Sequence, residues 1–153
     1  MKRITSIIIF VLGLYFISAG QAYKGMDGKY YDEEGKLFSG VYKEVYHDTV
    51  IKTLVEVKNG IPDGLTRIYF ENGKLEEVRS FREGMMDGKW ERWNMQDKKV
   101  AEAFYMGNLK HGKWYIWDDQ GVLRYDMTYV KGKKSGTWLM FDENGNLIDQ
   151  KEY

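Results

Sequence analysis

The sequence predicts an all-β protein in which antiparallel β-hairpins follow one another in an elongated, twisted meander sheet. Three observations predict this fold class. Glycines recur every 24 residues, aromatic and aliphatic residues repeat in register with them, and turn-forming pairs separate the apolar segments. Helical periodicity is absent after residue 22. The chain is therefore predicted to be built from one kind of repeated hairpin.

The N-terminal segment has the pattern of a signal peptide. Two basic residues precede an apolar run over residues 7–17, and small residues follow it up to Ala22. We predict cleavage after Ala22, which removes residues 1–22 and leaves a periplasmic or extracellular protein with no transmembrane segment. The alternative is an uncleaved membrane anchor, although the apolar run is short against the roughly 20 residues that span a bilayer.

Residues 23–39 are predicted to form a truncated capping repeat. The segment from Tyr30 to Leu37 copies the first strand and turn of the repeated unit, but its glycine, Gly35, lies only five residues before Gly40. The second half of a full unit has no room in this interval. We therefore expect a shortened unit that covers the N-terminal end of the sheet.

Five units of 24 residues are predicted over residues 40–153. Each begins with a glycine, and aromatic residues predominate two, five and seventeen residues after it, while aliphatic residues predominate eleven residues after it. The last unit reaches Tyr153, in the final aromatic column, so we expect its hairpin to be complete. The unit glycines are Gly40, Gly64, Gly88, Gly112 and Gly136.

Each unit is predicted to contain two turns. Asn72-Gly73 and Asn144-Gly145 lie between apolar segments, and Asn-Gly is typical of a type I′ turn, in which both residues have positive φ. A second turn precedes each unit glycine, with Asn108 where other units have glycine. Strand, hairpin turn, strand and connecting turn then give about ten strands in all.

The sequence leaves open how the aromatic residues are divided between the two faces of the sheet. Positions two and five after the glycine are separated by an odd number of residues, and side chains alternate along a regular strand. Either both faces carry aromatic residues, or a β-bulge brings the two positions to one face.

Charge and composition exclude several classes of function. The 23 basic and 23 acidic residues are interspersed, so the basic patch of a nucleic-acid-binding protein is absent. Removal of residues 1–22 takes away two basic residues and no acidic ones, which leaves 21 against 23 and a net charge near −2. Cysteine is absent, which excludes disulfides and thiolate metal sites.

No catalytic, cofactor-binding or metal-binding residue is predicted. His47 and His111 stand at different positions of the unit, and no third metal ligand accompanies them. The serines lack the context of a nucleophile, so an enzyme is the least favoured class. A cluster of acidic turn residues lacks the spacing of a calcium loop and is expected to be solvated; it comprises Asp118, Asp119, Asp142 and Glu143.

The aromatic residues of the central and C-terminal units are the candidate partner-binding surface. Packing is the favoured role for such rings, but a sheet one layer thick does not hide both faces, and Trp and Tyr are enriched at interfaces. We therefore expect part of the set to be available to a partner. The candidate residues are Trp90, Trp93, Trp114, Trp117 and Trp138.

The repeated pattern resembles the MORN-repeat variant family. In the last unit the pattern is glycine at 136, Trp138 and Phe141, followed by Asn144-Gly145 and Leu147. The resemblance extends over nearly all of the chain after residue 30, and the first unit departs from it by lacking the hairpin glycine. It implies a β-hairpin repeat protein without catalytic motifs. Some relatives resemble the YwqK-type antitoxin component of toxin–immunity modules, whereas ordinary MORN repeats are linked to membranes and scaffolding.

We therefore expect an exported, non-catalytic repeat protein that binds another protein through its aromatic surface and needs no cofactor. The alternative is a module of the cell envelope that contacts polysaccharide or a lipid surface. Export also departs from an antitoxin role in the cytoplasm, which is where such a protein meets its toxin. Nucleic acid is not an expected partner.

Overall fold

The structure is a computed structural model that describes residues 22–47 and 49–153. The predicted signal peptide lies, apart from Ala22, outside the described residues. The described part of the chain contains no helix long and apolar enough to cross a membrane.

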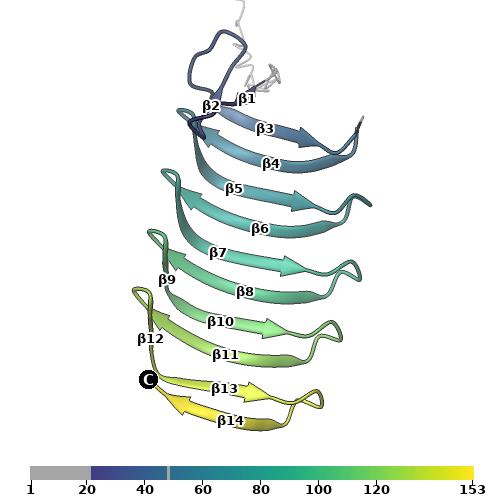
Figure 1. Cartoon of the computed structure of the whole chain (residues 1–153), viewed down its shortest axis with the longest axis vertical. Helices are drawn as coiled ribbons and strands as arrows, with labels where there is room; N and C mark the ends of the chain where they lie inside the picture. The colour runs from purple at the N-terminus through teal and green to yellow at the C-terminus, as the bar shows by residue number, and fades with distance from the viewer. Residues whose placement is uncertain (1–21, 48) are drawn as a thin grey trace, which may run out of the picture.

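The described residues form the predicted antiparallel meander, and the sheet is open at both ends (Figure 1). Ten strands pair in sequence order, each with its neighbours along the chain, so the fold class predicted from the repeat is confirmed. Glycine at the turns and alternating apolar residues in the strands are the local causes. The strands are β3 (Gly40–Val45), β4 (Ile51–Lys58), β5 (Ile61–Tyr69), β6 (Leu75–Arg82), β7 (Met85–Trp93), β8 (Lys99–Met106), β10 (Gly112–Trp117), β11 (Leu123–Val130), β13 (Thr137–Phe141) and β14 (Leu147–Glu152).

Four short strands complete the described topology. β9 (Leu109–Lys110) pairs with β8, and β12 (Lys133–Lys134) pairs with β11. Each of these short strands forms, with its partner, the two sides of a connecting turn between units. β1 (Tyr23–Lys24) pairs with β2 (Tyr30–Tyr31) in a separate small sheet.

The segment that contains β1 and β2 packs on the first hairpin. Tyr30 is 6% exposed and forms the main buried cluster with Val55 and Val57, against which Phe38 and Tyr42 also pack. The Tyr30 amide donates to the carbonyl of Gly60 at 2.9 Å, which joins the segment to the turn between β4 and β5. This segment, called the cap below, therefore packs against the first hairpin.

The type I′ turns do not lie at the Asn-Gly pairs where the sequence predicted them. At Asn72-Gly73 only the glycine has positive φ, at 82°, so the type I′ prediction there is wrong. The amide of Gly73 bonds to the carbonyl of Phe70, and the glycine then closes a longer loop. The type I′ geometry occurs in the connecting turns, where both central residues have positive φ, as at Asn59-Gly60. Asn108 has φ of 67° there, as predicted.

Side chains in the loops explain the longer hairpin turns. Asn94, Asp118 and Asp142 each accept two backbone N–H groups of their own loop at 2.8–3.0 Å. Such caps stabilise a loop of several residues against a two-residue turn. The amides of Val122 and Gln120 also lower the pKa of the Asp118 carboxyl.

A β-bulge near the tip of every hairpin lies in the second strand. In the central unit Arg92 pairs with Ala101 and Trp93 pairs with Lys99, so Val100 is the extra residue. The first strand therefore stays regular between Trp90 and Trp93, and these two side chains point to opposite faces. The same register shift recurs in the other four units. Of the two arrangements left open by the sequence, both faces carry aromatic residues.

The sheet is one layer thick, and burial is concentrated on one of its faces. The face that bears Trp90 and the residues opposite it on β8 is called the ladder face, and the other is called the charged face. The buried residues lie in the cap or on the ladder face and are Tyr30, Val55, Val57, Thr66, Ala103, Met127 and Tyr129. Most other strand side chains are partly exposed.

Candidate binding face

Seven aromatic side chains form a continuous row across the strands of the ladder face, which we call the aromatic ladder. Consecutive ring centroids lie 4.6–6.3 Å apart, and the ring planes are tilted by 46–59°. These values are typical of favourable aromatic packing. The row alternates between residues two and seventeen positions after the unit glycine, and consists of Phe81, Trp90, Tyr105, Trp114, Tyr129, Trp138 and Tyr153.

Cations lie over the ladder rings. Lys110 Nζ is 4.4 Å from the Trp114 ring centroid and 4.8 Å from that of Tyr129. Lys134 Nζ occupies the equivalent place one unit later, 4.4 Å from both Trp138 and Tyr153. Such contacts stabilise by about 0.5–1 kcal/mol at exposed sites.

The indole N–H groups of the ladder differ between units. Trp114 Nε1 donates to the Phe104 carbonyl and Trp138 Nε1 to the Thr128 carbonyl, each at 3.0 Å. Trp90 Nε1 is buried and has no hydrogen-bond partner within the described chain. The Arg79 guanidinium lies 4.9 Å from the Trp90 ring centroid. The two C-terminal tryptophans are therefore held more specifically than Trp90.

Three hollows lie along the ladder face. The first adjoins the cap and is lined by residues that include Tyr42 and Phe81, with a volume of about 570 Å³. The second, about 140 Å³, lies between Trp90 and Trp114 over small alanine side chains. The third, about 250 Å³, lies beside Trp138. Together they form an interrupted groove that crosses the strands beside the aromatic ladder.

The five predicted tryptophans do not share one surface. Trp90, Trp114 and Trp138 belong to the aromatic ladder. Trp93 and Trp117 lie on the charged face, where Lys99 Nζ is 5.9 Å from the Trp93 ring centroid and Tyr115 packs on Trp117. The structure therefore divides the candidate set into two, because three positions along a regular strand reverse the side-chain direction.

Sequence reasoning missed half of the ladder. Tyr105 and Tyr129 lie between the tryptophans, although they belong to a different sequence column. Their column of aromatic residues was a visible signal, as was the repeated lysine that precedes two of the unit glycines. What the sequence did not supply was the register that places these columns side by side.

The charged face carries a network of four side chains in the central unit. Lys89 and Lys99 each contact both Glu91 and Glu102, with N–O distances of 2.5–3.1 Å. Partial burial by itself raises the pKa of each carboxyl, but hydrogen bonds from the two lysines outweigh this effect and lower both pKa values below the ordinary range.

The network predicts a loss of stability in acid. A carboxyl whose folded pKa is lowered stabilises the fold above its unfolded pKa, and this contribution disappears as the pH falls through the folded pKa. We expect a Lys89→Met/Lys99→Met variant to be less stable than the wild type by about 1 kcal/mol at neutral pH. The gap should close as the pH falls through the lowered pKa values of the two carboxyls in the folded wild type.

Urea unfolding at a series of pH values measures this gap. Lys131→Met/Lys133→Met is the matched control, because it removes the same charge from an exposed connecting turn. A gap that stays constant with pH, or one that the control reproduces, would show that the network does not carry the effect.

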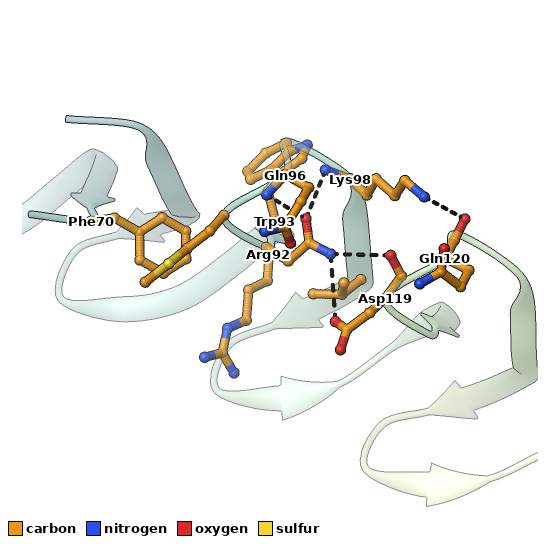
Figure 2. Close-up of a pocket in the computed structure, with 10 residues that line it drawn as sticks. Phe70, Arg92, Trp93, Gln96, Lys98, Asp119 and Gln120 are labelled. Carbon is orange, nitrogen blue, oxygen red and sulfur yellow. Dashed lines mark hydrogen bonds between the residues drawn. The ribbon is translucent and has the colours of Figure 1, made fainter. Parts of the chain in front are cut away.

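The hairpin tips form another hollow, of about 590 Å³, lined by residues of three successive hairpins (Figure 2). Phe70 and Trp93 line its apolar part, and Lys98 Nζ donates to the Gln120 carbonyl at 3.0 Å across the loops. Asn94 Nδ2 also lies 3.4 Å from Asp119 Oδ1. These contacts join consecutive units, so the hollow belongs to the stacking of the loops.

The histidines and acidic turn residues take part in local contacts. His47 Nε2 lies 2.6 Å from Glu71 Oε1, and both side chains are mostly exposed. His111 stands in a column of turn residues that includes Asp63 and Asp87, and each of these accepts an N–H from the next connecting turn. No group of three or more metal-ligating side chains occurs within residues 22–47 and 49–153.

Comparison with known proteins identifies the repeated unit. A family model described as MORN repeat variant matches residues 62–83, 110–131 and 134–153, which correspond to the second, fourth and fifth hairpins. A search of curated proteins found no match. Repeats of this family are typically non-catalytic. The three matched hairpins are therefore similar to MORN repeat variant units, and they belong to a β-sheet with an aromatic cluster on one surface.

Proposed function

We propose that this chain is an exported, non-catalytic repeat protein that binds another protein through the ladder face. The observation that carries the proposal is the aromatic ladder on a sheet one layer thick. A second layer does not cover it beyond the cap, within the described residues. Its Trp, Tyr and Lys side chains, apart from the buried Tyr129, therefore remain partly exposed. Export rests on the N-terminal sequence pattern.

The composition and rigidity of the ladder favour a macromolecular partner. Trp, Tyr and Arg are the residues that most often carry binding energy at protein interfaces. Each ladder ring is held by its neighbours, and Trp114 and Trp138 are held by hydrogen bonds as well. A partner therefore meets side chains that are already ordered, which lowers the entropic cost of binding.

The arrangement of the rings favours a protein partner over a polysaccharide. A sugar ring stacks best on an open, flat aromatic face. The ladder rings are tilted against one another, and a lysine ammonium lies over the ring of two of the tryptophans. A lipid surface or a polysaccharide remains the competing occupant. A toxin is one partner that the likeness to antitoxin-type relatives suggests.

Capture of partners with face-specific variants tests the proposal. Ile116→Asp/Tyr125→Asp alters the ladder face at two paired positions that are 39% and 38% exposed. Phe104→Asp/Val41→Asp is the matched control on the charged face, with exposures of 38% and 40%. We expect the wild type and the control to retain the same protein from the native envelope fraction, and the ladder-face variant to lose it.

Circular dichroism must first show that both variants are folded. Loss of the partner from the control alone would contradict the proposal, because it would place binding on the charged face. Retention on membranes or cell-wall material by the wild type, without any specific protein, would favour the competing occupant.

A further inference from the structure

The ladder face repeats at a fixed interval across the strands. Each unit contributes two strands, and neighbouring strands lie about 4.7–4.9 Å apart, so equivalent side chains recur about every 9.4–9.8 Å. Lys110 and Lys134 are equivalent in this sense, as are Trp114 and Trp138. A linear partner that makes the same contact with each unit needs a repeat of this length.

A polyproline II helix has this repeat. It has three residues per turn and rises about 3.1 Å per residue, so one face recurs about every 9.3 Å. Its backbone makes no internal hydrogen bonds, and proline-rich segments of this kind dock on aromatic grooves. If such a segment lies along the aromatic ladder, one residue of each three-residue turn faces each successive unit.

Lysines of the ladder face that lack an ion pair favour an acidic residue at this position, even with the Asp149 carboxylate beside Trp138. Lys110, Lys134 and Lys151 make no ion pair with a carboxylate within the described residues, whereas Arg79 is paired with Glu77. The ammonium groups of Lys110 and Lys134 recur with the units. An acidic side chain at every third position of the segment would meet each of them in turn.

The hollows beside the ladder provide room for the other two residues of each turn. The hollow between Trp90 and Trp114 is floored by Ala101 and Ala103, whose small side chains leave space next to the rings. The hollow beside Trp138 is lined by Met127 and other mostly apolar residues. Pyrrolidine rings are compact, apolar and already ordered, so they suit such shallow hollows.

We propose that the ladder face binds an acidic polyproline II segment of a partner protein, lying across the strands with one turn on each repeat unit. This inference rests on the proposed function and names the chemistry of its partner. Tryptophans and tyrosines contact the prolines, and Lys110 and Lys134 contact acidic side chains spaced three residues apart.

Fluorescence anisotropy with labelled synthetic peptides tests the spacing. The protein is purified from cells that express the full chain, and the probe is a capped twelve-residue peptide with the sequence Glu-Pro-Pro repeated four times. The control peptide has the same composition, with the four glutamates together at one end. We expect the periodic peptide to bind about tenfold more tightly than the control.

Lysine variants test whether the peptide binds at the ladder face. Lys110→Gln/Lys134→Gln should weaken binding of the periodic peptide about tenfold, whereas Lys131→Gln/Lys133→Gln, which removes the same charge in a connecting turn, should leave it unchanged. Equal affinity for the two peptides, or an equal effect of both double variants, would overturn the inference. Either result would show that the peptide is attracted by positive charge alone, whatever the spacing of its glutamates.

Two further probes separate this inference from the proposed function. Tighter binding of polygalacturonate or of anionic phospholipid vesicles, lost with Lys110→Gln/Lys134→Gln, would overturn the inference in favour of a polysaccharide or membrane. Absence of binding to the periodic peptide, while a native protein partner is still lost from Ile116→Asp/Tyr125→Asp, would overturn the inference and leave the proposed function standing.

Discussion

Trp114→Ala is expected to lower the free energy of unfolding by about 3 kcal/mol. The ring is packed between Tyr105 and Tyr129, with centroids 5.2 and 5.3 Å away, and it lies beneath Lys110. Removing it breaks both ring contacts, the cation contact and the hydrogen bond to the Phe104 carbonyl. In a repeat protein each unit depends on its neighbours, so a gap in the middle of the row weakens two interfaces.

Denaturant unfolding measures this loss, and two phenylalanine variants separate its causes. Trp114→Phe keeps a ring but loses the hydrogen bond, for an expected cost of about 1 kcal/mol. Trp90→Phe should cost less, because Trp90 Nε1 has no hydrogen-bond partner to lose within the described chain. An unfolding curve of Trp114→Ala that overlays the wild type would show that the ring contributes no packing energy.

Gly88→Ala is expected to destabilise the protein by about 2–3 kcal/mol. Gly88 has φ of 100°, which residues with a Cβ rarely adopt, and an added Cβ would lie 3.1 Å from the Ser80 Cβ. The cause lies in the register, because Arg79 pairs with Trp90 and Phe81 pairs with Met86. Ser80 therefore faces three residues, and the chain bends sharply at the glycine.

A second glycine supplies the control for Gly88. Gly73 also has positive φ, at 82°, but no atom lies within 4 Å of an added Cβ. Gly73→Asn should therefore cost less than about 1 kcal/mol, since Asn tolerates the left-handed region better than other residues with a side chain. Thermal melts measure the loss of stability in each variant. Equal losses would contradict the view that the unit glycine is required because the neighbouring strand packs closely against it.

The fold was predictable from the sequence because its determinants are local and repeated. Gly64 and Gly88 mark equivalent bends, and the apolar columns fix the strands between them. Two hairpin turns with Asn-Gly were assigned the wrong type, because dipeptide preference ignores the neighbouring side chain. In the loop that contains Asn144-Gly145, for example, the Asp142 carboxylate caps two backbone amides and stabilises a longer turn.

The candidate site was predictable only in part. The sequence identified Trp114 and Trp138 but grouped them with Trp93 and Trp117, which lie on the opposite face. Side-chain direction depends on which strand holds the bulge, and the spacing of aromatic residues alone does not contain this information. The tyrosines that complete the row, such as Tyr129, depend likewise on the register between strands.

A photo-cross-linker placed on each face in living cells tests the central claim most directly. Tyr125 on the ladder face and Phe104 on the charged face are both 38% exposed, so p-benzoylphenylalanine at either position samples its surroundings equally. The account predicts a discrete cross-linked protein from position 125 and none from position 104. The same adducts from both positions, or an adduct from position 104 alone, would contradict binding through the ladder face.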